Sequence, residues 1–270
     1  SDPWLNGRIT ALHACSDLWA CGARVVAAQA VVTLPQTSES AQQMLLAQTL
    51  AGIRSALEPQ DAKVIGGHTL EARDGQAQAP ISRSVQVVLS VSGQAVETFW
   101  PKAGLQEGDR LLLSRPLGTG VLFAAAMAGA APASALDAAL KQMGTSQHPL
   151  LEQLLTLQSE QPGVIHAATD ITGFGLLGHL GEMLRDPALH IELEGSAITA
   201  LPEALSLLEK GYASSLAPAN RRSWCLLDRG SVSLALKGTV PGGEEHQAML
   251  DLLVDPQTCG PLLLACPEAT

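Results

Sequence analysis

The stretch from Asp170 to His179 (DITGFGLLGH) carries the clearest chemical pattern in the chain. A carboxylate is followed at once by a glycine-rich turn, which leads into an apolar, helix-like run. A carboxylate in this position can hold a hard divalent cation, and glycines let backbone N–H groups approach phosphate oxygens. The stretch therefore predicts a magnesium and nucleotide site. The alternative is structural: a strand ends in a tight turn, and Asp170 caps the next helix.

Further segments place glycine or acidic residues next to expected strand ends: Ser16-Asp17, Gly66 to Thr69, and Asp255 to Thr258. For Asp17 two interpretations stay open. It is a second magnesium carboxylate that meets Asp170 across the fold, or it is a helix N-cap or a residue of a solvated turn. Magnesium sites commonly use one or two protein carboxylates together with phosphate oxygens and water, so two aspartates are enough.

His68 follows two glycines that free the backbone to meet a ligand. We expect the backbone from Gly67 to Thr69 to contact nucleotide, in preference to an acid or base role for the imidazole. His179 stands among leucines, which favours a structural role. Cys259 has no positioned base in the sequence, so packing is favoured over nucleophilic chemistry.

The turn from Pro116 to Gly120 is a second glycine-containing candidate for phosphate binding. It lacks the lysine of a P-loop. A tight turn between a strand and a helix is therefore the favoured interpretation.

Composition limits the classes of partner. The 270 residues carry 26 acidic and 16 basic side chains, a net charge of −10, and no basic cluster, so nucleic acid is not an expected partner. The apolar runs are too short to cross a membrane, and the N-terminal residues lack a signal-peptide pattern. The five cysteines show no CxxC spacing, which disfavours a zinc or disulfide framework and favours a reducing, cytoplasmic location. An acidic protein that handles nucleotides is expected to use a divalent metal.

Strand-like and helix-like patterns interleave along the chain, which predicts a mixed α/β (α+β) class. Strands are expected at residues 24–34, 64–65, 85–91, 110–114, 164–169, 190–194, 231–236 and 262–265, and helices at 46–57, 121–128, 149–161, 202–210 and 245–253. The polar stretch from Glu71 to Ser82 is expected to be a loop. The pattern breaks between Pro101 and Gly108, so we expect two domains, residues 1–104 and 105–270.

In this order, the segments resemble the selenophosphate synthetase (selenide, water dikinase) family, within the aminoimidazole ribonucleotide synthetase-like superfamily. The stretch that begins at Asp170 is the most specific. The matching stretches run from near the first residue to near the last: 14–22, 66–69, 114–120, 170–180 and 255–258.

The resemblance implies a two-domain fold, in which an N-terminal α/β domain forms a homodimer through its β-sheet and an α+β domain follows. In that family ATP, selenide and water become selenophosphate, AMP and orthophosphate, with magnesium ions between carboxylates and phosphates. Carried over by position, Asp17 and Asp170 are implied to be metal ligands. Asp17 together with Gly67, His68 and Thr69 is implied to contact the nucleotide.

The chain also departs from the family pattern. The family carries a reactive cysteine or selenocysteine, a lysine and a further metal aspartate upstream of Ser1, so we assign no catalytic residue and expect a fragment of a longer protein. Cys259-Gly260-Pro261 replaces a serine and two glycines. Two alternatives stay open: a superfamily enzyme with another phosphoryl acceptor, and a non-catalytic dimerisation or nucleotide-binding domain fused to a pyridine nucleotide-disulfide oxidoreductase.

Overall fold

The computed structural model describes residues 2–72, 84–96, 98–236 and 243–268. The chain divides into two compact units, Ser1–Phe99 with Gly144–Leu154, and Trp100–Met143 with Leu155–Thr270. Both contain helices and strands, so the predicted mixed class is confirmed. The domain boundary between residues 104 and 105 stays a prediction. Most of the expected loop from Glu71 to Ser82 lies outside the described residues.

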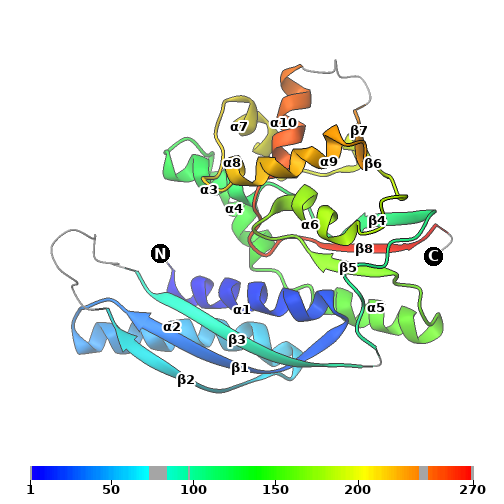
Figure 1. Cartoon of the computed structure of the whole chain (residues 1–270). Helices are drawn as coiled ribbons and strands as arrows, with labels where there is room; N and C mark the ends of the chain where they lie inside the picture. The colour runs from blue at the N-terminus through cyan, green and yellow to red at the C-terminus, as the bar shows by residue number, and fades with distance from the viewer. Residues whose placement is uncertain (1, 73–83, 97, 237–242, 269–270) are drawn as a thin grey trace. The chain divides into compact units, whose positions relative to one another are not determined.

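The first unit is a three-stranded sheet with two long helices on one face (Figure 1). The strand order is β2-β1-β3, with β1 parallel to β2 and antiparallel to β3. Its elements are α1 (Pro3–Ala20), β1 (Ala23–Leu34), α2 (Glu39–Leu57), a short 3₁₀ helix (Glu58–Gln60), β2 (Lys63–Glu71) and β3 (Gln86–Ala95).

Local sequence explains how the two helices begin and pack. The side chain of Asp2 accepts the Leu5 N–H at 3.0 Å and thereby caps α1. The helices then approach each other closely at glycines. A Cβ on Gly7 would lie 2.2 Å from the Thr49 carbonyl oxygen, and one on Gly52 would lie 1.9 Å from the backbone of α1.

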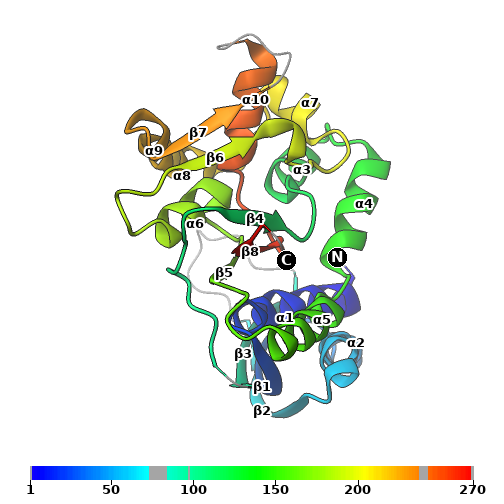
Figure 2. The same ribbon diagram turned by 90° about the vertical axis from the view of Figure 1, so that its right-hand side faces the viewer.

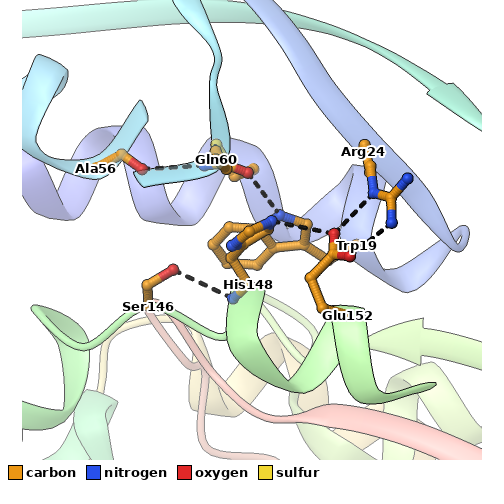
Figure 3. Close-up of polar contacts among 8 residues, drawn as sticks. Trp19, Arg24, Ala56, Gln60, Ser146, His148 and Glu152 are labelled. Atoms are coloured by element: carbon orange, nitrogen blue, oxygen red, sulfur yellow. Dashed lines mark hydrogen bonds and ion pairs between the residues drawn. The ribbon is translucent and has the colours of Figure 1, made fainter. Parts of the chain in front are cut away.

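The start of α5 (His148–Glu160) belongs to the first unit and is tied to it by polar contacts (Figure 3). Arg24 of β1 donates to both carboxylate oxygens of Glu152, at 2.8 and 2.6 Å. In the same region the buried Trp19 indole donates to Gln60 Oε1 at 3.1 Å. These bonds connect segments that are far apart in the sequence.

The second unit holds an antiparallel sheet of order β4-β8-β5 and a parallel pair, β6 and β7, which lie side by side in Figure 2. Helices α6 and α10 contribute the buried Leu177 and Leu252 to one apolar core. The elements of this unit are β4 (Asp109–Leu113), α3 (Thr119–Met127), α4 (Ala133–Met143), β5 (Ala167–Asp170), α6 (Gly175–Met183), β6 (Ile191–Glu194), 3₁₀ helix Gly195–Ala197, α7 (Ala204–Glu209), α8 (Ala217–Asn220), 3₁₀ helix Arg221–Trp224, α9 (Cys225–Asp228), β7 (Val232–Ala235), α10 (Glu244–Leu253) and β8 (Leu262–Pro267).

Most predicted elements are present, with their ends shifted by a few residues; α2 begins well before the predicted residue 46. The short buried strand predicted at residues 64–65 is wrong. β2 runs from Lys63 to Glu71 and is largely exposed, because it is an edge strand of a sheet covered on one face. None of the helices in the described ranges is long and apolar enough to span a membrane.

Candidate functional site

Asp170 is the last residue of β5, as the sequence predicts. It pairs with Leu262 of β8, and all four residues of β5 are buried. The residue itself is 6% exposed. The alternative in which Asp170 caps the next helix is wrong, since α6 follows Phe174 and has no side-chain cap. The strand therefore delivers this carboxylate to a fixed place at its end.

The loop at residues 171–174 is held by residues from other segments. The Thr172 carbonyl oxygen accepts the Gln257 N–H at 3.0 Å. The Gly173 carbonyl oxygen accepts from Asn220 Nδ2 at 2.7 Å. Because backbone groups on consecutive residues are fixed, the loop after Asp170 has little freedom to rearrange.

The segment that departs from the family pattern packs against the same loop. The Pro261 carbonyl oxygen accepts the Ile171 N–H at 2.8 Å. A Cβ on Gly260 would lie 2.0 Å from the Ile171 carbonyl oxygen, so this position requires glycine. Cys259 is 3% exposed, in line with the predicted packing role, and its carbonyl oxygen accepts from Arg115 at 3.1 Å.

His179 of α6 also reaches the loop. Its Nε2 atom accepts the Thr172 N–H at 3.1 Å. A backbone N–H can only donate, so Nε2 carries the lone pair and the ring proton of the neutral imidazole sits on Nδ1. Nδ1 faces Glu182 Oε2 at 3.2 Å, and Lys102 Nζ lies 2.5 Å from that same oxygen. Burial lowers the pKa of His179, which favours the neutral ring.

The turn from Gly118 to Gly120 opens α3, and its N–H groups already have partners. The side chain of Gln257 accepts from the backbone of Gly118 and Thr119 at 2.9 and 3.2 Å. The carboxylate of Asp255 accepts the Gly120 N–H at 3.0 Å. The alternative of a phosphate loop is therefore disfavoured, because the amides that would bind phosphate are taken by protein groups.

Asp255 is buried in this position, at 1% exposure. One carboxylate oxygen, Oδ2, accepts from Gly120 and from Gln257 Nε2. The other, Oδ1, has no hydrogen-bond partner within the described part of the chain. Burial raises the pKa of Asp255 to about 7, against the opposing effect of the hydrogen bonds it accepts.

Asp17 lies in the last turn of α1 and is exposed. Its interpretation as an N-cap or a turn residue is wrong, and so is the placement of Ser16-Asp17 near a strand end. The helix runs through both residues to Ala20 and stops where Gly22 adopts a positive φ of 69°. A carboxylate in a last turn faces the negative end of the helix dipole.

Gly67, His68 and Thr69 lie within β2. Gly67 has a φ of 149°, and a Cβ there would lie 1.9 Å from the Ala30 carbonyl oxygen of β1. This glycine is therefore required by strand pairing, whatever else it contacts. His68 is opposite Val31, on the face of the sheet away from the helices, and is exposed.

The structure thus supports the sequence-predicted site residues unevenly. Asp17 and the segment from Gly67 to Thr69 belong to the first unit, and Asp170 belongs to the second. Their meeting in one cleft stays a prediction. The described residues contain no group of three His, Cys, Asp or Glu placed to hold a metal. Sequence reasoning missed the supporting roles of Asn220 and Gln257. The Asp-Pro-Gln-Thr motif drew attention to Gln257, and no sequence pattern indicated Asn220.

Comparison with known proteins gives the relationship of the chain. Residues 1–90 match the family described as AIR synthase related protein, N-terminal domain, and residues 106–269 match its C-terminal domain. A selenide, water dikinase of Desulfitobacterium hafniense is 32% identical over 267 residues, which cover 98% of this chain and 69% of that protein. The chain belongs to the selenide, water dikinase family. A selenide, water dikinase of Paraburkholderia xenovorans is 33% identical over 99% of this chain and 68% of its own length.

A solved structure supports the fold of this family member. Thiamine monophosphate kinase from Aquifex aeolicus matches with a TM-score of 0.65 over 100% of this chain and 74% of that chain. The sequence identity is 16%, so this match shows a shared fold. The predicted two-domain aminoimidazole ribonucleotide synthetase-like fold is therefore confirmed.

Proposed function

We propose that this selenide, water dikinase family member is an ATP- and magnesium-dependent phosphoryl-transfer module, with selenide as the acceptor that the family implies. The observation that carries the proposal is the placement of Asp170. It stands at the end of a buried strand and precedes a loop whose backbone groups are fixed. Phosphoryl transfer depends on positioning and charge neutralisation, and a fixed carboxylate suits both.

Magnesium fits the donors that the chain supplies. Asp17 and Asp170 are both carboxylates, the ligand type that magnesium prefers, and the remaining positions are filled by phosphate oxygens and water. The exposed Asp17 lies near the C-terminal end of α1, where the helix dipole favours cations. When bound, magnesium would neutralise phosphate charge and orient the triphosphate.

We further propose that Gly67, His68 and Thr69 contact the nucleotide in a homodimer. The open face of the β2-β1-β3 sheet supports this. His68 lies on this face beside Val31, which also pairs with Val88, and Val88 is 67% exposed. Further exposed apolar side chains on these strands include Val26, Ile65 and Leu70. An apolar surface of this kind marks an interaction site, and a second copy offers a complementary one.

Calorimetry with magnesium and a non-hydrolysable ATP analogue tests the binding proposal. We expect Asp17→Asn and Asp170→Asn each to weaken magnesium-dependent affinity at least tenfold, or about 1.4 kcal/mol. Asp137→Asn, which changes an exposed carboxylate of α4, is the matched control and leaves affinity unchanged. Unchanged affinity in both site variants, or no binding by the parent chain, refutes the proposal.

The acceptor needs a separate measurement. Release of AMP and orthophosphate that rises with added selenide supports selenide as the acceptor. Release that is equal without selenide points to another acceptor. A chain that binds the nucleotide and releases no AMP retains the binding proposal and refutes transfer by this chain alone.

A further inference from the structure

His179, a residue of helix α6, contacts the loop that follows Asp170. We propose that His179 is a positioning residue that fixes this loop through the backbone of Thr172, and thereby sets the place of Asp170; this inference rests on the proposed function. The contact is the 3.1 Å hydrogen bond from the Thr172 N–H to His179 Nε2. The Thr172 hydroxyl also lies 3.3 Å from Nε2.

The geometry requires an acceptor at this point. The carbonyl oxygen of Thr172 is held by Gln257 and that of Gly173 by Asn220, so these bonds fix the acceptor groups of the loop. His179 fixes a donor group of the loop, the Thr172 N–H. Without it the partly buried Thr172 N–H would lose its partner, and an unsatisfied buried donor is costly enough to reorient a loop.

The surroundings of His179 favour the tautomer in which Nε2 accepts a hydrogen bond. Glu182 Oε2 lies 3.2 Å from Nδ1, close enough to attract its proton although the two atoms form no regular hydrogen bond, and Lys102 pairs with the same carboxylate. The nearby negative charge favours a proton on Nδ1, and the Thr172 N–H requires a lone pair on Nε2. Both effects therefore favour the tautomer in which Nε2 accepts.

A purely structural role is the competing explanation. His179 is 4% exposed and lies on a helix with the buried Leu176, Leu177 and Leu180. Leucine would serve as well as histidine if packing alone mattered. The two explanations therefore predict different results for a leucine and for a glutamine at position 179, because only glutamine places an acceptor near the position of Nε2.

The experiment compares His179→Leu and His179→Gln in the full chain. Amide hydrogen exchange at Thr172 reports the bond itself, and calorimetry with magnesium and the ATP analogue reports the site. We expect His179→Leu to speed Thr172 exchange and raise the dissociation constant, each by about tenfold or more, in the range found for supporting residues of metal sites. His179→Gln should stay within about threefold of the parent on both readouts. His246→Leu, which changes a half-buried histidine of α10, is the control and leaves both unchanged.

The outcomes separate this inference from the proposed function. Parent-like Thr172 exchange in His179→Leu overturns the hydrogen-bond role, and fast exchange with unchanged affinity overturns the positioning role. Absence of nucleotide binding by the parent chain refutes the proposed function before any variant is compared. If His179→Leu does not fold, His179→Phe replaces it, since phenylalanine keeps an aromatic ring at this position and has no acceptor atom. It should speed Thr172 exchange and weaken binding, and unchanged values overturn the proposal.

Discussion

The buried carboxyl group of Asp255 is expected to make the stability of the fold depend on pH. Two physical effects oppose each other there. The N–H groups at the start of α3 and the amide of Gln257 favour the ionised form, and burial at 1% exposure favours the protonated form. Burial has the larger effect: Oδ2 accepts from Gly120 and Gln257, whereas Oδ1 has no hydrogen-bond partner among the residues that the structure describes. We predict that Asp255→Asn removes a pH-dependent loss of stability.

The sign and size follow from the pKa. In the folded chain the pKa of Asp255 is about 7, above its ordinary value of 3.8, so the folded state binds more protons between these values. The contribution of Asp255 is therefore most favourable below pH 4, and stability falls as pH rises toward 7. The shift corresponds to ~4 kcal/mol across this window. Asparagine stays neutral, can keep the bond from Gly120, and has no such dependence.

Urea unfolding of the parent and Asp255→Asn from pH 4 to pH 8 measures this effect. Other titrating groups act on both proteins and cancel in the difference between their free energies of unfolding. That difference should move in favour of the variant by about 4 kcal/mol as pH rises to 8. A difference that is flat, or one that moves in favour of the parent, would show that the N-terminal end of α3 stabilises the anion and would refute the reasoning.

Other substitutions test the fold through unfolding in urea. Gly67→Ala should destabilise the first unit by more than about 2 kcal/mol, because its Cβ would overlap the backbone of β1; a parent-like midpoint contradicts this pairing. Leu177 is 0% exposed, so Leu177→Ala should lower the free energy of unfolding by about 2–5 kcal/mol. Leu112 is 51% exposed, so Leu112→Ala should lower it by less than about 0.5 kcal/mol. Equal losses in the two variants would contradict the assigned core. Arg24→Gln breaks the partly exposed pair with Glu152 and should cost no more than about 1 kcal/mol, with the loss disappearing at 1 M salt.

The sequence predicts those parts of the fold that depend on local patterns. Alternation gave the strand that carries Val87 and Leu89, and the apolar run before Asp170 gave β5 with the carboxylate at its end. Each pattern arises because one face of an element is buried, which is a property of neighbouring residues. The position of Asp170 was predictable for this reason.

The parts that escaped prediction depend on contacts between distant residues. Asp17 was not recognised as helical because α1 is rich in small residues, such as Gly7, that matter only where they meet α2. The hydrogen bond that caps α3 joins Gln257 to Thr119, which are 138 positions apart in the sequence. No pattern of neighbouring residues indicates this contact. The acceptor role of His179 likewise depends on how the loop folds back to α6.

The central claim is that Asp17 and Asp170 hold one magnesium ion that carries the nucleotide. A double-mutant cycle with Asp17→Asn, Asp170→Asn and the double variant tests it most directly, using calorimetry with magnesium and the ATP analogue. If both carboxylates share the ion, the second substitution adds little to the first, and the coupling exceeds about 1.4 kcal/mol. Additive losses, with each substitution acting independently of the other, would contradict the claim.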